Sequence, residues 1–289
     1  MNVAGAYLRV TARPRMATAE RARIRMNRPK ASPRPPARTS RRHIVTEGEH
    51  SGFRVYTVVP RHREPHCTVV YLHGGAYIAE IARQHWGFIS RLADRGARVV
   101  VPIYGLAPQH SYREAYPFVT EVYRRAAEEP EPLTLMGDSS GGGLALGLAH
   151  TLRDLGDAGR RPDRLVLISP WLDLTIANPE VADVDDPWLV REGLLEAGRA
   201  WAGGDDPTDP RLSPLNADLT GLPHIDIYAG TRDLAYPDCK LLRDRADAAG
   251  VSAALTVDHG GLHVTPLLPV PEGRTSATTI ARKVCALGR

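Results

Sequence analysis

The sequence predicts an α/β fold with a mostly parallel central sheet of about eight strands and helices on both faces. From Phe53 onward, short apolar runs alternate with longer stretches of helical periodicity, a pattern typical of strands connected by crossover helices. The apolar runs are nearly continuous, which suits strands that are buried on both faces. A chain of 289 residues with 43% hydrophobic residues can bury the core of one large domain.

Seven apolar runs are expected to form strands, and six periodic stretches are expected to form helices. The expected strands are 54–59, 68–72, 98–103, 133–136, 164–168, 224–228 and 253–257. The expected helices are 86–95, 116–127, 142–155, 191–202, 238–248 and 276–286. Between them, segment 174–212 is too long for a simple crossover, so we expect a lid insertion near the site. The main domain is therefore predicted to span residues 43–289.

Residues 1–42 differ from the rest of the chain in composition. They hold 12 Lys or Arg and one acid, Glu20, whereas residues 43–289 hold 25 basic and 32 acidic residues. Segments rich in Arg and Pro and poor in apolar residues rarely order on their own. We expect a flexible arm or a partial lid. Other interpretations are a start codon placed too early, a contact with anionic membrane or nucleic acid, a targeting peptide, or a lid helix over residues 7–26.

Several function classes are disfavoured by composition. The acidic balance of residues 43–289 gives no reason to expect nucleic-acid binding. No apolar run reaches 18 residues and no secretory signal is evident, so we expect no transmembrane segment and a cytoplasmic location. Cys67, Cys239 and Cys285 are odd in number and widely spaced, which favours buried thiols over disulfides or a zinc site. No metal or organic cofactor is expected.

The strongest local signal is a Gly-x-Ser-x-Gly pattern formed by Gly137, Ser139 and Gly141. It follows an apolar run and precedes a helix rich in small residues, the setting in which a sharp turn lifts a nucleophilic serine above a sheet. A side chain at either flanking glycine would collide with neighbouring backbone. The helix N-terminus would then direct free N–H groups toward a developing oxyanion. Ser139 is therefore the candidate nucleophile.

A second glycine-rich loop, His73-Gly74-Gly75-Ala76, follows the expected strand 68–72. Backbone N–H groups of such a loop can approach a substrate oxygen closely. We expect Gly74 and Gly75 to donate to the oxyanion, with the Ser140 N–H as the third donor. His73 is expected to hold the loop by hydrogen bonds and not to transfer protons.

The acid and the base are expected after the late strands, in the order serine, acid, histidine. Asp233 follows the run 224–228, whereas its competitor Asp238 precedes a helical pattern and is expected to be an N-cap. His259 and His263 are separated by two glycines, which favours a loop over a metal-binding helix face. We choose His263 as the base.

Together these motifs resemble the hormone-sensitive lipase-like branch of the α/β-hydrolases, which includes carboxylesterases and arylacetamide deacetylases (α/β-hydrolase fold-3). The matching motifs are HGGAY at 73–77, YGLAP at 104–108, GDSSGGG at 137–143, SPWLD at 169–173, LSPL at 212–215, GTRDL at 230–234 and GGLHV at 260–264. The resemblance implies an α/β-hydrolase fold, a triad of Ser139, Asp233 and His263, and oxyanion donors at Gly74, Gly75 and Ser140. Ala76 departs from the third glycine usual in the family, and the family's N-terminal lid helices are not evident in the Arg/Pro-rich segment.

The expected function is a serine hydrolase that cleaves carboxylic esters of small to medium acyl groups through a covalent acyl-serine intermediate. The expected partner is a small-molecule ester, with a homodimer as a further possibility. Because the histidine base must be neutral, activity should fall below roughly pH 6 to 7. The alternatives are an amidase or deacetylase acting on small acylated amines, and a non-catalytic small-molecule receptor on the same fold.

Overall fold

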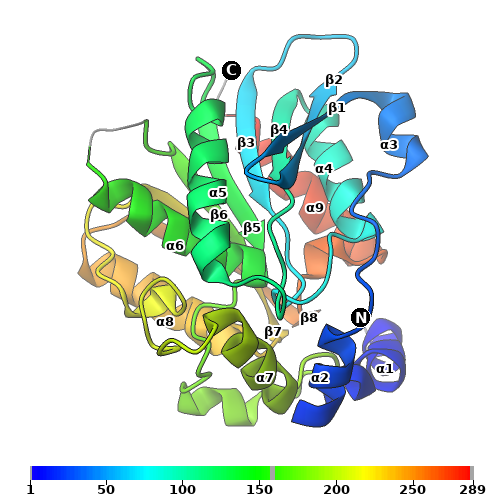
Figure 1. Ribbon diagram of the computed structural model, residues 1–289, viewed down its shortest axis with the longest axis vertical. Coiled ribbons are helices and arrows are strands. Elements are labelled where there is room, and N and C mark those ends of the chain that lie inside the picture. The colour runs from blue at the N-terminus through cyan, green and yellow to red at the C-terminus, as the bar shows by residue number, and fades with distance from the viewer. Residues whose placement is uncertain (1, 157–159, 287–289) are drawn as a thin grey trace.

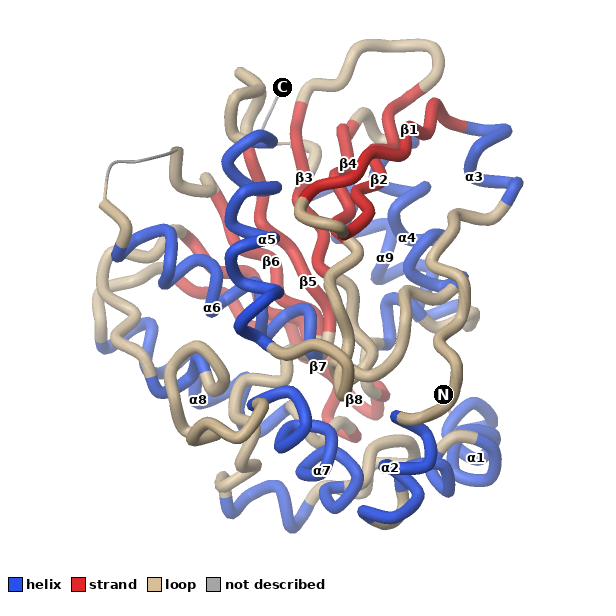
Figure 2. The backbone as a smooth tube through the Cα atoms, viewed as in Figure 1, coloured by secondary structure: helices blue, strands red, loops and turns tan. Residues whose placement is uncertain are grey.

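Within the described residues, eight strands form one sheet in the order β1-β2-β4-β3-β5-β6-β7-β8 (Figures 1 and 2). The computed structural model describes residues 2–156 and 160–286. The strands are β1 His43–His50, β2 Phe53–Pro60, β3 Cys67–Leu72, β4 Ala97–Pro102, β5 Leu133–Asp138, β6 Arg164–Ile168, β7 His224–Arg232 and β8 Ala253–Leu262. Strand β2 pairs antiparallel with β1 and β4, and the other neighbours are parallel. The predicted mostly parallel sheet is confirmed.

Helices cover both faces of this sheet (Figure 2). The helices are α1 Asn2–Thr11, α2 Ala19–Met26, α3 Ala37–Arg42, α4 Arg83–Asp94, α5 Tyr112–Ala126, α6 Ser140–Asp154, α7 Arg191–Ala202, α8 Tyr236–Ala248 and α9 Pro271–Val284, with short 3-10 turns η1 Arg13–Met16, η2 Pro179–Asp183, η3 Pro214–Asn216 and η4 Thr265–Leu267. Helices α5, α6 and α8 contribute to one buried hydrophobic cluster, and α4 and α9 contribute to another. The two clusters are the cores of the two faces.

The central strands explain the apolar runs of the sequence. Every residue of β3 and β5 is buried, as expected for parallel strands between two layers of helices. The outermost strand β1 was absent from the sequence prediction, because only His43 among its residues is buried and its sequence HIVTEGEH shows no clear apolar pattern. Strand β1 is therefore found only through its pairing with β2.

The predicted end of the last strand at Val257 is also corrected. Strand β8 continues to Leu262 through Gly260 and Gly261, where the sequence suggested a loop. A Cβ on Gly230 would lie 2.3 Å from the Gly261 backbone, and the β7–β8 register shifts between Gly230 and Arg232. The glycines thus permit a close, bulged strand pair.

The N-terminal segment is helical where it meets the insertion. Helix α2 lies next to α7 at one end of the sheet, and α1 packs against η1 on the other side of α2 (Figure 1); we call α1, η1, α2 and α7 the cap. Ala22 and Met26 of α2 are buried, and Arg23 pairs with Glu196 of α7 at 2.6 Å. Packing against α7 therefore orders an N-terminal segment whose composition alone would leave it flexible.

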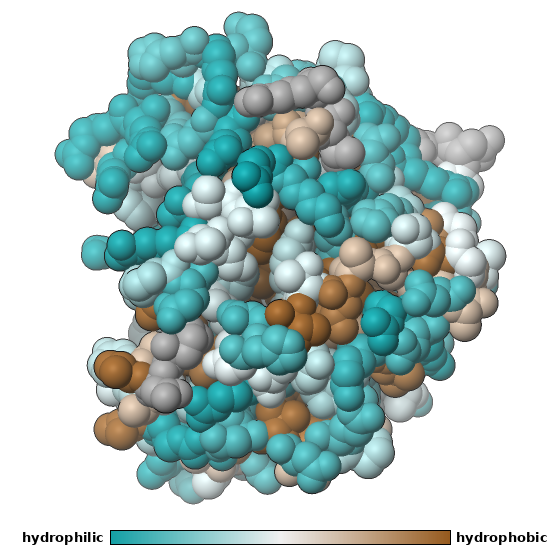
Figure 3. Space-filling view, turned by 180° about the vertical axis from the view of Figure 1, so that it is seen from behind, coloured by the Kyte–Doolittle hydropathy of each residue, from teal (hydrophilic) through white to brown (hydrophobic). Residues whose placement is uncertain are grey.

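The surface seen from behind is mostly hydrophilic, with hydrophobic side chains in small separate patches (Figure 3). Three large apolar side chains of α1 are exposed, namely Val3, Tyr7 and Val10. Among the described residues, no helix has both the length and the apolar character needed to cross a membrane.

Candidate active site

Ser139 occupies the sharp turn between β5 and α6. Its backbone angles are φ 52° and ψ −124°, a conformation that is strained for a residue other than glycine. The Ser139 N–H donates to the Ile168 carbonyl at 2.9 Å, and the Trp171 N–H donates to the Ser139 carbonyl at 2.8 Å. Hydrogen bonds to the end of β6 and the segment after it therefore hold the turn.

The glycines that flank Ser139 are required for space. A Cβ on Gly137 would lie 2.2 Å from the Gly141 carbonyl oxygen, and a Cβ on Gly141 would lie 2.1 Å from the Leu72 carbonyl oxygen. Backbone atoms cannot move aside as a flexible side chain can. The packing of β5, α6 and β3 thus forces glycine at both positions, as the sequence predicted.

The structure brings Ser139, Asp233 and His263 together from three separate parts of the chain. His263 Nε2 lies 2.9 Å from Ser139 Oγ, and His263 Nδ1 lies 2.9 Å from Asp233 Oδ1. Asp233 follows β7 directly and His263 follows β8 directly. Both side chains are buried. This is the connected arrangement of nucleophile, base and acid that acyl transfer uses.

Buried carboxylates control the charge of the His263 ring. Burial opposes the charged ring, but Asp233, through its charge and its hydrogen bond, and then Asp186 and Asp138 outweigh it and raise the pKa of His263. A raised pKa favours a base that accepts the serine proton readily.

Asp186 is a buried carboxylate that sequence reasoning missed. Its Oδ1 accepts the N–H groups of Trp188 and Leu189 at 2.7 and 2.9 Å, and its Oδ2 accepts the Leu234 N–H at 2.9 Å. The last bond fixes the residue next to Asp233. Burial, with the nearby Asp233 charge, raises the pKa of Asp186 to about 6. Asp186 therefore joins the insertion to the loop that carries Asp233.

The loop at residues 73–77 meets the serine turn through a second buried carboxylate, Asp138. Asp138 Oδ1 accepts the Tyr71 hydroxyl at 2.6 Å and the Gly74 N–H at 3.0 Å, while Oδ2 lies 3.2 Å from His85 Nε2. Burial opposes its ionisation, but His85 and these donors lower the pKa of Asp138. The Ala82 N–H donates to His85 Nδ1, so Nε2 carries the proton that faces Asp138.

This geometry corrects one expected oxyanion donor. The Gly74 N–H is already donated to Asp138, so it holds the loop and does not point to a substrate oxygen. In the part of the chain that the structure describes, the N–H groups of Gly75, Ala76 and Ser140 have no acceptor. Gly75 and Ala76 line the same cavity as Ser139. The free donors at the site are therefore Gly75, Ala76 and Ser140.

His73 lies behind this loop. Its ring is fully buried and stacks on Tyr104 with centroids 4.6 Å apart, and its Nδ1 lies 2.8 Å from the Gly74 carbonyl oxygen. Burial, together with the His85 ring, lowers the pKa of His73 to about 4. His73 is therefore neutral at pH 7, as expected for a residue that holds the loop.

The two competing residues lie outside the triad. Asp238 is the third residue of α8 and not its N-cap, because the helix begins at Tyr236. Its Oδ1 accepts the Asn178 side-chain amide at 2.9 Å, and burial raises its pKa to about 6. His259 is an exposed residue of β8. Neither residue is hydrogen-bonded to Ser139 or His263 in the described part of the chain.

Two cavities meet at Ser139 and His263. The larger has a volume of about 190 Å³ and an apolar wall that includes Trp188, Leu194 and Leu267. The smaller has about 20 Å³ and is lined by apolar side chains that include Trp171 and Ile176. Residues 2–156 and 160–286 contain no group of three or more His, Cys, Asp or Glu that could hold a metal ion. The site can thus seat a small molecule with its two ends on different sides of the serine.

The family is decided by the match of residues 69–267 to a family model described as alpha/beta hydrolase fold. This chain belongs to that α/β-hydrolase family. The acetyl-hydrolase of Streptomyces hygroscopicus is 33% identical over 222 residues, which are 73% of this chain and 73% of that protein. The esterase of Acinetobacter venetianus is 34% identical over 190 residues, 63% of this chain and 62% of that protein.

Solved structures agree with this assignment. An esterase from the bacterial hormone-sensitive lipase family is 26% identical, with a TM-score of 0.78 over 96% of this α/β-hydrolase and 98% of that chain. The predicted resemblance to hormone-sensitive lipase-like α/β-hydrolases is confirmed.

Proposed function

We propose that this α/β-hydrolase cleaves carboxylic esters of short acyl groups through a covalent acyl-serine at Ser139. Relatives named esterase and acetyl-hydrolase support the general activity. The observation that carries the mechanism is the continuous hydrogen-bonded chain from Ser139 through His263 to Asp233, with 2.9 Å at each step. Catalysis by this chain needs only groups that the protein itself supplies.

The reaction begins when His263 Nε2 takes the Ser139 proton as Oγ attacks the ester carbonyl. Asp233 keeps the proton on Nδ1 and stabilises the imidazolium. The N–H groups of Gly75, Ala76 and Ser140 stabilise the oxyanion, each contributing about 3 to 4 kcal/mol in comparable sites. The imidazolium then protonates the leaving alcohol, and water releases the acid by the same route.

The two cavities support a short acyl group and a larger alcohol. The void beside Trp171 measures about 20 Å³, little more than the roughly 10–15 Å³ that holds one water molecule, so only a small acyl group would fit there. The alcohol would then occupy the cavity of about 190 Å³, which the cap closes as a lid. This division explains acetyl and other short acyl groups better than long chains.

The two alternative functions, an amidase and a non-catalytic receptor, can be distinguished by which substrates are cleaved. An amidase with this triad would cleave matched anilides at rates comparable to esters, and a receptor would bind a small molecule without turnover. The connected triad favours catalysis over a receptor. A homodimer and a cytoplasmic location stay predictions of the sequence.

The test is the release of p-nitrophenol from acetyl, butyryl and octanoyl esters by the wild type and Ser139→Ala. We expect the rate to be highest for the acetyl ester, lower for the butyryl ester and lowest for the octanoyl ester, and kcat to fall at least about 10⁴-fold in the variant. Turnover by a folded Ser139→Ala protein at the wild-type rate would overturn the mechanism. Faster cleavage of the octanoyl ester would overturn the assignment of the small cavity.

A further inference from the structure

Of the described residues that line the larger cavity at Ser139, Arg25 of α2 is the only Arg or Lys. Arg25 also lines a surface pocket of about 660 Å³ between the cap and the loop at Ile78, Ala79 and Glu80. It therefore stands where the catalytic cavity and the outer pocket share a wall.

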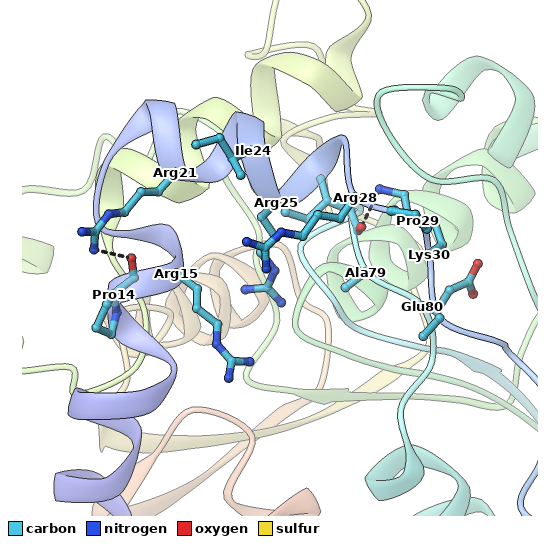
Figure 4. A pocket seen from close by; sticks show the side chains of 12 residues that line it. Pro14, Arg15, Arg21, Ile24, Arg25, Arg28, Pro29, Lys30, Ala79 and Glu80 are labelled. Atoms are coloured by element: carbon cyan, nitrogen blue, oxygen red, sulfur yellow. Dashed lines mark hydrogen bonds between the residues drawn. The ribbon is translucent and has the colours of Figure 1, made fainter.

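The Arg25 guanidinium has no hydrogen bond or ion pair in residues 2–156 and 160–286. Its neighbours add like charge: Arg25 and Arg28 extend into the middle of the pocket, and Arg15 extends toward it from η1 (Figure 4). Burial, followed by repulsion from Arg15 and Arg28, lowers the pKa of Arg25. A partly buried guanidinium without a partner is a costly arrangement, and an anion would relieve it.

Two other cations of this outer pocket, Arg21 and Lys30, already have partners. Arg21 donates to the Pro14 carbonyl at 2.9 Å. Lys30 donates to the carbonyls of Met26, Ile78 and Ala107 at 2.7, 2.9 and 3.0 Å, and so ties the cap to the oxyanion loop. These contacts give Arg21 and Lys30 structural roles that Arg25 lacks.

Glu80 is the carboxylate that lines both cavities together with Arg25, and its oxygens point away from Arg25 (Figure 4). Glu80 forms no ion pair with Arg25 within the described residues. Burial, opposed by Lys30 and Arg54, raises the pKa of Glu80 to about 7. Glu80 is thus partly protonated near neutral pH and does not neutralise Arg25.

We propose that Arg25 binds an anionic group, a carboxylate or a phosphate, on the alcohol part of the ester substrate. This inference rests on the proposed function and adds the substrate class to it. An anion that reaches Arg25 while the ester carbonyl lies at Ser139 must belong to a molecule that fits the cavity of about 190 Å³. A membrane surface or a nucleic acid would contact the outer arginines without entering this cavity.

The test compares 4-acetoxybenzoate with its neutral isostere 4-acetoxybenzamide, and 4-acetoxyphenyl phosphate serves as the phosphate probe. All three carry one aryl acetate, and kcat/KM is measured for each at low and high salt. The wild type is expected to prefer at least one anionic ester, and higher salt should weaken the preference. Which anionic ester gives the larger ratio identifies carboxylate or phosphate.

Arg25→Gln should lower kcat/KM for the preferred anionic ester by about 10-fold or more, as loss of a charge-assisted hydrogen bond implies. The rate for 4-acetoxybenzamide should stay within about twofold, which shows that the variant is folded. Arg23→Gln is the matched control, since it removes the same charge from the same helix but faces Glu196 outside the cavity. Arg25→Lys should retain part of the preference.

Equal effects of Arg25→Gln on the anionic and neutral esters would overturn the proposal, as would an equal loss in Arg23→Gln. The proposed function fails in a different way, because the wild type would then cleave none of the three acetates.

Discussion

The catalytic centre and the cap are built by different kinds of contact. At the centre, two backbone segments pack closely together. A Cβ added to Gly141 would lie only 2.1 Å from the Leu72 carbonyl oxygen. In the cap, contacts join segments that are far apart in sequence, such as Arg23 with Glu196 and Arg9 with Asp185. Close packing of backbone on backbone fixes the turn that carries Ser139, whereas side-chain pairs such as Arg23 with Glu196 hold the cap. A substitution can therefore damage one without the other.

Among the variants that separate the centre from the cap, Gly141→Ala is expected to have the largest effect, because it displaces the serine turn and leaves the cap contacts in place. The added Cβ meets the carbonyl oxygens of Leu72 and His73 at 2.1 and 2.5 Å. Displacing the turn and its oxyanion donors should lower kcat at least about 100-fold, and the free energy of unfolding should fall by about 1–3 kcal/mol. Ester kinetics and urea unfolding measure the two quantities.

Gly87→Ala is the matched control for that variant. Gly87 lies within α4, and a Cβ there would meet nothing within 4 Å. The control should keep full activity and gain up to about 1 kcal/mol of stability. Full activity in Gly141→Ala would contradict the steric account of the turn.

A smaller, converse effect is expected from Gly193→Ala in α7. Its Cβ would lie 2.2 Å from the Met16 carbonyl oxygen of η1, so α7 and η1 must separate. KM for short esters should change several-fold while kcat stays within about threefold, because uniform binding is altered and the triad is not. Gly198→Ala in the same helix meets its nearest neighbour at 3.4 Å and should resemble the wild type. A large loss of kcat in Gly193→Ala with an unchanged KM would show that the two regions are not separable.

The sequence predicts the residues that short motifs mark, but not the contacts that depend on how separate loops meet. Ser139, Asp233 and His263 were found because short motifs follow strands in a fixed order. The use of the Gly74 N–H by Asp138 was missed, since it depends on how two loops meet. Asp186 was missed for the same reason, because its partner Leu234 lies 48 residues away.

The helices of the segment 1–42 were not assigned with any certainty from the sequence. Their composition is that of a flexible arm, and only packing against α7 reveals which apolar residues are buried. Arg25 is one of 12 basic residues there, and no local pattern distinguishes it from the others. Its position in the cavity depends entirely on the tertiary fold.

The smallest effect is expected from Asp186→Asn. Asp186 lies in the insertion and is also hydrogen-bonded to the loop that carries Asp233. His263 must be neutral to act as a base, and its pKa is raised, so activity should fall as the pH drops through a value above 6.5. Asp186 contributes to that shift, and removal of its charge should move the acid limb to lower pH by less than about 1 unit. The asparagine amide would also face the Leu234 N–H, which lowers kcat modestly.

The pH dependence of kcat/KM measures this effect. Asp183→Asn is the control, since Asp183 is an exposed residue of η2 with the same charge. An acid limb of Asp186→Asn that coincides with those of the wild type and Asp183→Asn would contradict the role assigned to Asp186.

The proposed mechanism requires that Ser139 is the residue that becomes acylated. Its most direct test is to react the protein with a fluorophosphonate ester and to locate the adduct by peptide mass spectrometry. The account predicts one adduct, on Ser139, formed as activity is lost, and slower labelling when His263 is replaced by alanine. Loss of activity with the adduct on another residue, or full activity in a protein labelled at Ser139, would contradict it.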